Sequence, residues 1–421
     1  MTPEIKQRIE QIRQGEVPEG YVKKRKVVIP QQWGLPQIKD IASISSGSTP
    51  NRNNSEYWNG NIAWVTTGEL SSGHVNHTSE LITVKAVKET KMRIYPQGTL
   101  LMAMYGQGKT RGTVAILEID AAVNQACAAI TVKDGKSKFL FYQLKNSYQD
   151  IRKLSNTGNQ ENLNADIIKT YQVPWAPDEE QERISTILTT QDKVIKLKEK
   201  RLAEKQRQKK YLMQQLLTGK KRLPGFSEEW KKVKIGSFIK EIDERSTVNN
   251  QYEILSVTKN GMVFQSSHFN KQIASENNVG YKVVRRGNLA FSTMNLWMGS
   301  LDTLRICDTG IVSPAYKVFE FNQSLIVVNF AENYMKSAEM IWLYKANSEQ
   351  GASIVRRNLD LQALLNSEVA LPDISEQTAI AEVLSAADHE IDLLRHDIEQ
   401  EKQKKKALMQ LLLTGIVRVK T

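Results

Sequence analysis

The chain has 421 residues, 40% of them hydrophobic and 7% aromatic, which is enough to build packed cores and excludes a wholly disordered polypeptide. Its 58 Lys and Arg residues outnumber its 46 Asp and Glu residues, and the net charge of +12 favours a polyanionic partner such as nucleic acid, with a basic but inert surface as the alternative. No apolar run is long enough to span a membrane, no secretory leader is recognisable, and Cys127 and Cys307 are too few for a disulfide framework. We therefore expect a soluble protein of two to four domains in a reducing cytoplasm.

The first part of the chain predicts a short arm and then a mixed domain. Residues 4–14 predict a helix, and the basic run YVKKRK (21–26) follows it. Between residues 31 and 176, short apolar runs bounded by turn residues predict strands, as at NIAWVTT (61–67) and GTVAILEI (112–119). The segment FLFYQLKNSYQDIRKL (139–154) predicts a helix.

The segment AMYGQGKTRG (103–112) contains Gly-Lys-Thr and invites comparison with an ATP-binding phosphate loop. Such a loop needs a first glycine where this chain has Ala103, and a helix directly after the threonine. Residues 111–119 instead have the alternating, β-branched pattern of a strand. We therefore predict a turn between two strands, with Lys109 and Arg111 projecting toward a polyanion, and no ATP site.

No other segment indicates catalysis or metal binding. His74 and His77 form an isolated His-x2-His pair without a neighbouring cysteine, and a zinc site of that spacing needs further ligands. No glycine-rich cofactor fingerprint, methyltransferase loop or Ser/His/Asp set is apparent. We predict a binding protein that holds no metal or cofactor of its own.

Residues 178–218 predict one long helix, because apolar residues recur at spacings of three, four and seven and neither Pro nor Gly interrupts them. Asp178 and Gln181 resemble a capping box at its start, and Gly219 stands where it would end. At ~1.5 Å per residue the helix would be roughly 60 Å long. The positions between its apolar residues include Gln191, Lys198, Lys205 and Lys209.

The second half of the chain has the same pattern of short predicted strands and helices as the first half. EILSVT (253–258) and NLAFST (288–293) predict strands, and AENYMKSAEMIWLYKA (331–346) predicts a helix. A second long helical pattern then runs to Gly415.

The two long helices are copies of one sequence at a constant offset of 196 residues. QKKYLMQQLLTG (208–219) returns as KKKALMQLLLTG (404–415), and at an offset of 197 Trp33 meets Trp230. Two copies in one chain predict an antiparallel pair within the chain, and a coiled-coil dimer between two chains is the alternative. The apolar positions predicted to pair the helices, or to dock subunits, are Ile184, Leu188, Ile195, Leu202, Leu212, Leu216, Ile380, Leu384, Ile391, Ile398, Leu408 and Leu412.

In their order and repetition, these segments resemble the specificity subunits of type I restriction–modification systems. The resemblance covers nearly the whole chain. In the first half it is carried by ISSGSTP (44–50), TGNQENLNADIIKTYQVPWAPDEEQERI (157–184) and LMQQLLTG (212–219). In the second half it is carried by GIVSPAYKVF (310–319), RRNLDLQALLNSEVALPDISEQTAI (356–380) and LMQLLLTG (408–415). The second half has DERST (243–247) where the first has SSGSTP, so the role of that loop is not carried across.

The resemblance implies an α+β fold with two mixed target recognition domains in tandem, each followed by a long helix, and the two helices paired as an antiparallel coiled coil. The expected segments are an N-terminal helix and basic arm (1–30), recognition domain 1 (31–176), a central helix (177–222), recognition domain 2 (223–371) and a C-terminal helix (372–421). The implied ligand is double-stranded DNA with a two-part, asymmetric site.

The resemblance also implies partner subunits and assigns the catalysis to them. Two methyltransferase subunits would bind S-adenosylmethionine, and restriction subunits would use ATP and Mg²⁺, so this non-catalytic chain would need no cofactor. A coiled-coil scaffold with two protein-binding domains is the alternative, and it would bind DNA without sequence preference.

Base readout is expected from polar, aromatic and cationic side chains on the loops of the two domains. Trp297 could equally belong to a core. The candidates in domain 1 are Thr49, Arg52, Lys109, Arg111, Asn159 and Gln160, and those in domain 2 are Lys282, Arg285, Asn295, Trp297 and Arg356.

Overall fold

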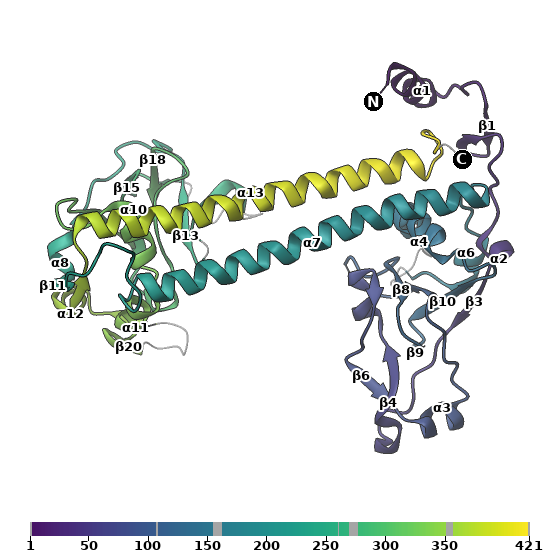
Figure 1. The fold of residues 1–421 in the computed structure, drawn as a ribbon, viewed down its shortest axis with the longest axis horizontal. Coiled ribbons are helices and arrows are strands. Elements are labelled where there is room, and N and C mark those ends of the chain that lie inside the picture. Colours follow the sequence, from purple (N-terminus) through teal and green to yellow (C-terminus); the bar gives the residue numbers. More distant parts are fainter. Residues whose placement is uncertain are drawn as a thin grey trace. The chain divides into compact units, whose positions relative to one another are not determined.

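The computed structural model describes residues 2–106, 108–154, 162–259, 261–268, 277–350 and 357–419 (Figure 1). The chain forms two compact units. Unit 1 comprises Met1–Lys198 and Asp397–Thr421, and unit 2 comprises Glu199–His396. The long helices α7 (Asp178–Leu216) and α13 (Ile374–Leu412) each contribute one part to both units.

Unit 1 begins with α1 and the β1–β2 hairpin and continues into two sheets. The larger sheet has the order β3-β10-β7-β8-β5, antiparallel except for the β5–β8 pair, and the smaller sheet has the order β6-β4-β9. Its elements before α7 are α1 (Pro3–Arg13), β1 (Tyr21–Lys24), β2 (Val27–Pro30), α2 (Ile38–Ile41), β3 (Ala42–Ser46), η1 (Ser55–Tyr57), β4 (Trp58–Val65), η2 (Thr67–Ser72), β5 (His74–Val75), β6 (Glu80–Ile82), α3 (Val84–Thr90), β7 (Leu100–Ala103), β8 (Val114–Leu117), β9 (Ala121–Val123), β10 (Cys127–Val132), α4 (Ser137–Asn146), α5 (Tyr148–Lys153) and α6 (Ala165–Thr170).

Unit 2 is built around an antiparallel sheet of order β12-β19-β16-β17. Four further strand pairs surround it: β11–β22, β13–β14, β15–β18 and β20–β21. Its elements between the long helices are β11 (Lys231–Lys234), α8 (Ile235–Phe238), β12 (Ile239–Ile242), β13 (Leu255–Thr258), β14 (Gly261–Phe264), α9 (Gln265–His268), β15 (Lys282–Arg285), β16 (Leu289–Ser292), η3 (Leu296–Met298), β17 (Leu301–Thr303), β18 (Thr309–Val312), β19 (Tyr316–Phe321), α10 (Val328–Tyr334), α11 (Ala338–Ala346), β20 (Ser348–Gln350), β21 (Arg357–Leu359), α12 (Leu361–Asn366) and β22 (Glu368–Leu371).

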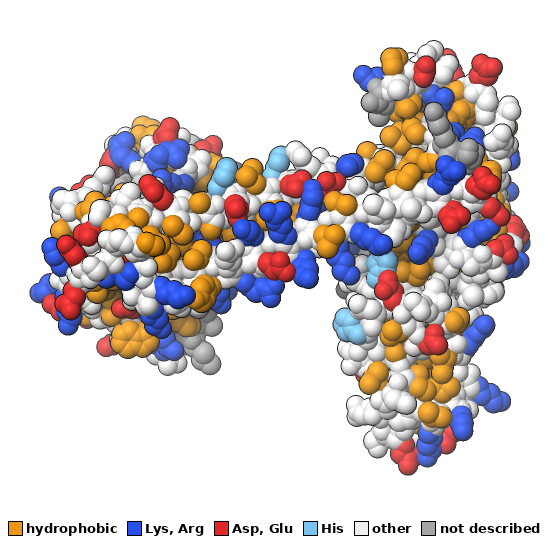
Figure 2. Space-filling view, in the orientation of Figure 1, with side chains coloured by type: hydrophobic (Ala, Val, Ile, Leu, Met, Phe, Trp, Pro, Cys, Tyr) orange, Lys and Arg blue, Asp and Glu red, His pale blue; other side chains and the backbone are white. Residues whose placement is uncertain are grey.

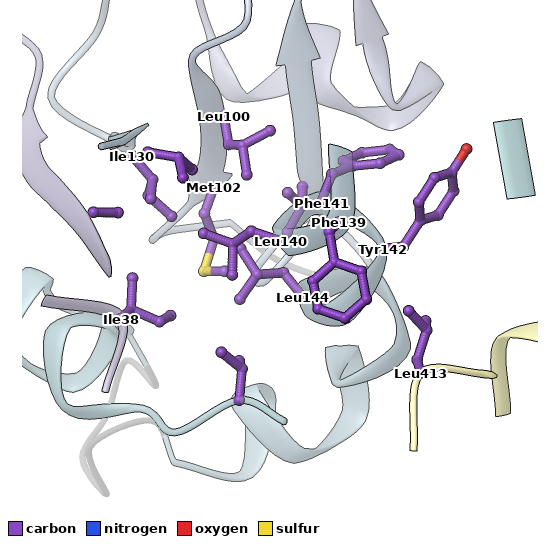
Figure 3. Packing of buried hydrophobic residues seen from close by; sticks show 14 of the residues in the cluster. Ile38, Leu100, Met102, Ile130, Phe139, Leu140, Phe141, Tyr142, Leu144 and Leu413 are labelled. Atoms are coloured by element: carbon purple, nitrogen blue, oxygen red, sulfur yellow. The ribbon is translucent and has the colours of Figure 1, made fainter. Parts of the chain in front are cut away.

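The central strands β7, β8 and β10 of the larger sheet of unit 1 are buried on both faces, so they are almost wholly apolar. Leu100 and Met102 of β7 pack with α4 in one core, whereas Leu101 and Ala103 belong to a second core. Figure 3 shows α4 in the first core, with Leu413, from the segment after α13, beside it. The end of the second repeat therefore forms part of the core of the first domain.

Two predicted helices are each divided in two. The segment 139–154 breaks at Ser147 between α4 and α5, and the segment 331–346 breaks between α10 and α11. Ser337 causes the second break, because its hydroxyl accepts a hydrogen bond from the Met340 N–H (3.3 Å) and caps the new helix. Apolar periodicity continues through both breaks, so the pattern alone did not reveal them.

The capping box predicted at the start of α7 is wrong. Asp178 is already within the helix, and the Gln181 side chain donates to the Ala176 carbonyl (2.7 Å) instead of accepting from the first turn. The second repeat does have a cap, because Asp373 accepts a hydrogen bond from the Glu376 N–H (2.8 Å). Gly219 and Gly415 follow the two helices with φ of +66° and +72°, which completes the predicted helix ends.

The two long helices pair antiparallel within each unit, as predicted. In unit 1, Lys198 Nζ lies 2.8 Å from carboxylate oxygens of both Asp397 and Glu401. Hydrogen bonds to Glu401 from Lys198, which has the larger effect, and from the Gln191 amide lower the pKa of the Glu401 carboxyl group to about 2. In unit 2, α7 and α13 also pair antiparallel, through the ion pairs Lys205–Glu390 and Lys209–Asp388.

The predicted apolar positions lie in the interiors of the two units. Leu202, Leu212 and Leu408 are half-buried. The remaining nine are buried: Ile184, Leu188, Ile195, Leu216, Ile380, Leu384, Ile391, Ile398 and Leu412.

One repeated contact fastens the helix ends to each unit. In unit 1, the buried Glu180 carboxylate accepts hydrogen bonds from the Trp33 indole (2.9 Å) and the Arg418 guanidinium (2.6 Å). In unit 2, the buried Glu376 carboxylate accepts from the Trp230 indole (3.1 Å) and from Arg222 (2.5 and 2.6 Å). Each carboxylate thus joins the start of a domain, the start of one long helix and the segment after the other.

We predict that Glu180→Gln lowers the free energy of unfolding by about 1.5–3 kcal/mol, because hydrogen bonds to a charged group contribute about that much. Gln keeps the shape of Glu but removes the charge opposite Arg418. The matched control is Glu56→Gln, whose side chain is 63% exposed and pairs with Lys85, so its loss should cost less than about 1 kcal/mol. Thermal and denaturant unfolding of the full chain measure both, and equal effects of the two variants would contradict the assignment.

Candidate nucleic-acid interface

Several predicted recognition residues lie near one end of each main sheet. In unit 1, β3 ends at Ser46 and β7 at Ala103, while β8 and β10 run the other way. The loops 47–54, 104–113 and 124–126 therefore leave the same end of the sheet, which we call sheet end 1. The corresponding loops in unit 2 are 243–254, 293–300 and 313–315, and they form sheet end 2.

The Gly-Lys-Thr segment is a turn between β7 and β8, and a strand follows it as predicted. Gly106 (φ +132°) has no space for a side chain, since a Cβ there would lie 2.8 Å from Thr110 Cβ. Gly106 is therefore required by the tight turn. Lys109, the predicted contact residue, is exposed on it.

Two side chains from α5 hold this turn in place. The Tyr148 hydroxyl donates to the Lys109 carbonyl (2.6 Å), and Arg152 donates to the Arg111 carbonyl (2.8 Å) and to the Tyr148 hydroxyl (3.1 Å). The Leu163 N–H also donates to the Met104 carbonyl where the turn begins (2.9 Å). These contacts fix the backbone on either side of Lys109.

The prediction that Arg111 projects from the turn is wrong. Its side chain is only 7% exposed, because the turn folds back onto α5 and the backbone of Arg111 is held by Arg152. Sequence reasoning missed Tyr148 and Arg152. The signal for them was weak, since both lie in an ordinary helical pattern some 40 residues after the turn.

The other described candidates of domain 1 already have partners within the domain. The Thr49 hydroxyl donates to the Gln125 side chain. The next residue, Ala126, accepts a hydrogen bond at its carbonyl from the Met104 N–H (2.8 Å). Thr49 therefore belongs to sheet end 1. Arg52 makes two hydrogen bonds to Glu80 and lies 4.1 Å from the centre of the Trp58 ring, although its side chain is still 53% exposed.

Sheet end 2 presents different side chains on an equivalent turn. Asn295 and Trp297 lie between β16 and β17, and both are half-buried. The Trp297 Nε1 atom is buried without a hydrogen-bond partner among the described residues, and the Arg357 guanidinium lies 5.5 Å from the ring centre. The Arg357 N–H donates to the Met294 carbonyl (3.4 Å), so this turn too is held by a residue from outside it.

Lys282 and Arg285 lie on β15 in different environments. Lys282 is 4% exposed, and its amine lies 3.2 Å from Asp243 and 3.5 Å from Glu241. The expectation that Lys282 lies on an accessible loop is therefore wrong, because two carboxylates at the end of β12 hold it inside the domain. Arg285 is 55% exposed and makes hydrogen bonds of 2.7 and 3.1 Å to Glu244. Arg285 stays a prediction.

Three predicted residues, Asn159, Gln160 and Arg356, lie outside the described residues. Within the described ranges, no group of three or more His, Cys, Asp or Glu side chains is arranged to hold a metal. His74 Nδ1 instead lies 2.8 Å from Glu118 Oε1. Of the helices in the described parts, none combines the length and hydrophobicity needed to cross a membrane.

Comparisons with known proteins agree with the repeat. A family model described as the type I restriction modification DNA specificity domain matches residues 30–206 and again residues 227–403. The MjaIX specificity subunit of Methanocaldococcus jannaschii is 34% identical over 41% of this chain, and the match spans only 40% of that protein. The putative MjaX specificity subunit of the same organism is 24% identical over 93% of this chain and 95% of its own length. The fold is similar to that of the S subunit from M. genitalium, with a TM-score of 0.53 at 12% identity over 93% of this chain and 98% of that one.

We predict that Tyr148→Phe weakens DNA binding about 2- to 12-fold, as expected when one hydrogen bond worth ~0.5–1.5 kcal/mol no longer holds the Lys109 turn. The ring remains, so the free energy of unfolding should fall by no more than about the same ~0.5–1.5 kcal/mol. Tyr57→Phe is the matched control, because the Tyr57 hydroxyl also makes one short side-chain hydrogen bond, to Glu89 (2.6 Å). Titration of a fluorescent duplex checks both variants, and indistinguishable affinities would mean that the anchored turn does not contact DNA.

Proposed function

Since the chain belongs to the type I restriction–modification DNA specificity family, we propose that it reads a two-part, asymmetric DNA site, one part at each sheet end. The observation that carries this proposal is one repeated frame with two different sets of loop side chains. Sheet end 1 offers the exposed Lys109 and also Thr49, and sheet end 2 offers Asn295 and Trp297. A lysine suits the edge of guanine and an asparagine suits the edge of adenine, so the two ends would read different sequences.

In this proposal the chain recognises DNA and its partners perform the chemistry. Methyltransferase subunits would bind S-adenosylmethionine, restriction subunits would use ATP and Mg²⁺, and the complex would act in the cytoplasm. The net charge of +12 supports the DNA part of the proposal, because Lys and Arg side chains release counterions from the duplex.

Two exposed leucines support docking of two like subunits. Leu197 on α7 is 66% exposed, Leu393 on α13 is 56% exposed, and the two are 196 residues apart, which is the offset of the repeat. Lys and Arg side chains are frequent along the long helices (Figure 2). An exposed leucine at the same position of each copy suits two equivalent apolar contacts, and hence one methyltransferase subunit on each helix.

The long helices would also set the distance between the two half-sites. α7 has 39 residues, and at ~1.5 Å per residue a helix of that length is about 58 Å long, or roughly 17 base pairs at ~3.4 Å each. The paired order of the helices supports this role, because two helices joined by ion pairs along the seam resist bending better than one.

We predict that four residues inserted after Ala203 on α7, and four after Asp392 on α13, lengthen the methylated sequence by about two base pairs. The ion pairs Lys198–Asp397 and Lys205–Glu390 place these two positions opposite each other. The insertion adds about 6 Å and about 40° beyond one full turn, while two base pairs add about 7 Å and about 70°, so both sheet ends should still reach DNA.

Methylome sequencing of cells that carry each variant gives the result. Two residues inserted at the same places would rotate the seam by about 200° and should abolish methylation. An unchanged gap would refute the spacing role of the helices, and the absence of any two-part methylated sequence with the unaltered chain would refute the proposed function.

We also predict that Leu197→Ser and Leu393→Ser each weaken the binding of one methyltransferase subunit, and that the double variant weakens both. Lys200→Ser, three residues from Leu197 with a side chain 73% exposed, is the control for the loss of a long side chain. Native mass spectrometry counts the subunits. Full occupancy in the double variant would show that the leucines are not the docking positions.

A further inference from the structure

A cavity of about 270 Å³ opens beside the Lys109 turn of domain 1. It is lined by Gly112 and Thr113 from the turn, by Ser71 and Gly73 from the end of η2, and by Lys145 at the end of α4. The cavity thus lies between the anchored turn and a single cationic side chain.

Lys145 has no carboxylate within salt-bridge distance among the described residues. Its amine lies 5.1 Å from the centre of the Phe141 ring. Burial, and then the positive charge of Lys405, lower the pKa of Lys145, and Asp192 only partly opposes them. Asp192 is itself engaged, because it pairs with Lys405 and accepts a hydrogen bond from the Tyr142 hydroxyl (2.7 Å). An anion in the cavity would supply the negatively charged partner that Lys145 lacks.

Two of the residues that line the cavity are glycines. Gly73 has a φ of +76°, and a Cβ on it would lie 3.2 Å from Lys145 Nζ. Gly112 has a φ of +81°, and a Cβ on it would lie 3.1 Å from Arg152 Cγ. Both positions therefore favour glycine, and Gly73 leaves room for the Lys145 amine.

We propose that Lys145 and this cavity bind a phosphodiester group of the DNA that domain 1 reads. The proposal rests on the proposed function and adds to it a backbone contact that fixes the register of domain 1. A lysine is suited to this task, because a flexible point charge meets phosphate oxygens without reading the bases. The neighbouring Lys109 would meet the DNA on the exposed side of the same turn.

Unit 2 has an isoleucine beside the equivalent turn. Ile341 lies on α11, and its Cδ1 would lie 3.4 Å from a Cβ on Gly299, at the end of that turn. An isoleucine is therefore accommodated at this helix position beside a turn glycine. Isoleucine is therefore the replacement chosen for Lys145.

The test is the full chain, assembled with its methyltransferase subunits, carrying Lys145→Ile. Affinity is measured at several salt concentrations for a duplex that contains the methylated site and for an unrelated duplex. Loss of one phosphate contact should weaken both complexes and make the slope of log affinity against log salt less negative by about 0.9. Lys85→Ile, a lysine of the same domain paired with Glu56, is the control and should leave the slope unchanged.

Phosphate-ethylation interference provides a second measurement that works with the unaltered chain. One ethylated phosphate at the half-site of domain 1 should weaken binding of the unaltered chain and have no effect on Lys145→Ile. A folded Lys145→Ile variant with an unchanged slope, or an interference pattern identical to that of the unaltered chain, would overturn the proposal. Failure of the unaltered chain to bind DNA at all would instead overturn the proposed function.

Discussion

The buried carboxylates Glu180 and Glu376 hold each unit together at a point where three distant segments meet. A carboxylate can be buried only if its charge is matched and its oxygens accept hydrogen bonds, and here an indole and a guanidinium do both. The guanidinium always comes from the segment that follows the other copy's helix. The first domain therefore cannot complete its own core: it needs Arg418 and Leu413 from the end of the chain.

This arrangement explains why the repeated part of the sequence is the helix and its flanks, while the domains differ. Asp192 pairs with Lys405 and Asp388 pairs with Lys209, and the two pairs are related by the same offset of 196. Substitution at any of these positions disturbs two elements at once. The exposed loop side chains at the sheet ends do not join two elements in this way. Side chains as different as Lys109 and Asn295 can therefore occupy equivalent turns of the two domains.

Much of the fold could be predicted from the sequence because its signals are periodic or repeated. Apolar spacing identified the long helices, and the repeat identified the antiparallel pair. The errors concern side chains whose surroundings are assembled from distant parts of the chain. Arg111 and Lys282 look like solvent-facing cations in sequence, but α5 covers the first, and Glu241 and Asp243 at the end of β12 pair with the second. Nor could Tyr148 be predicted as an anchor, since its partner is a backbone carbonyl 39 residues away.

The candidate cations show how the protein can be basic and yet selective for a particular register of DNA. Arg52 and Arg285 are exposed but engaged with Glu80 and Glu244. Exposed ion pairs contribute little stability, so a phosphate or a guanine edge can replace either carboxylate at small cost, and only where the DNA brings a suitable acceptor to the arginine. A cation without a carboxylate partner, such as Lys145, would attract a phosphate that fits beside it. In the proposed function, backbone attraction and base selection would thus fall to different side chains of the same domain.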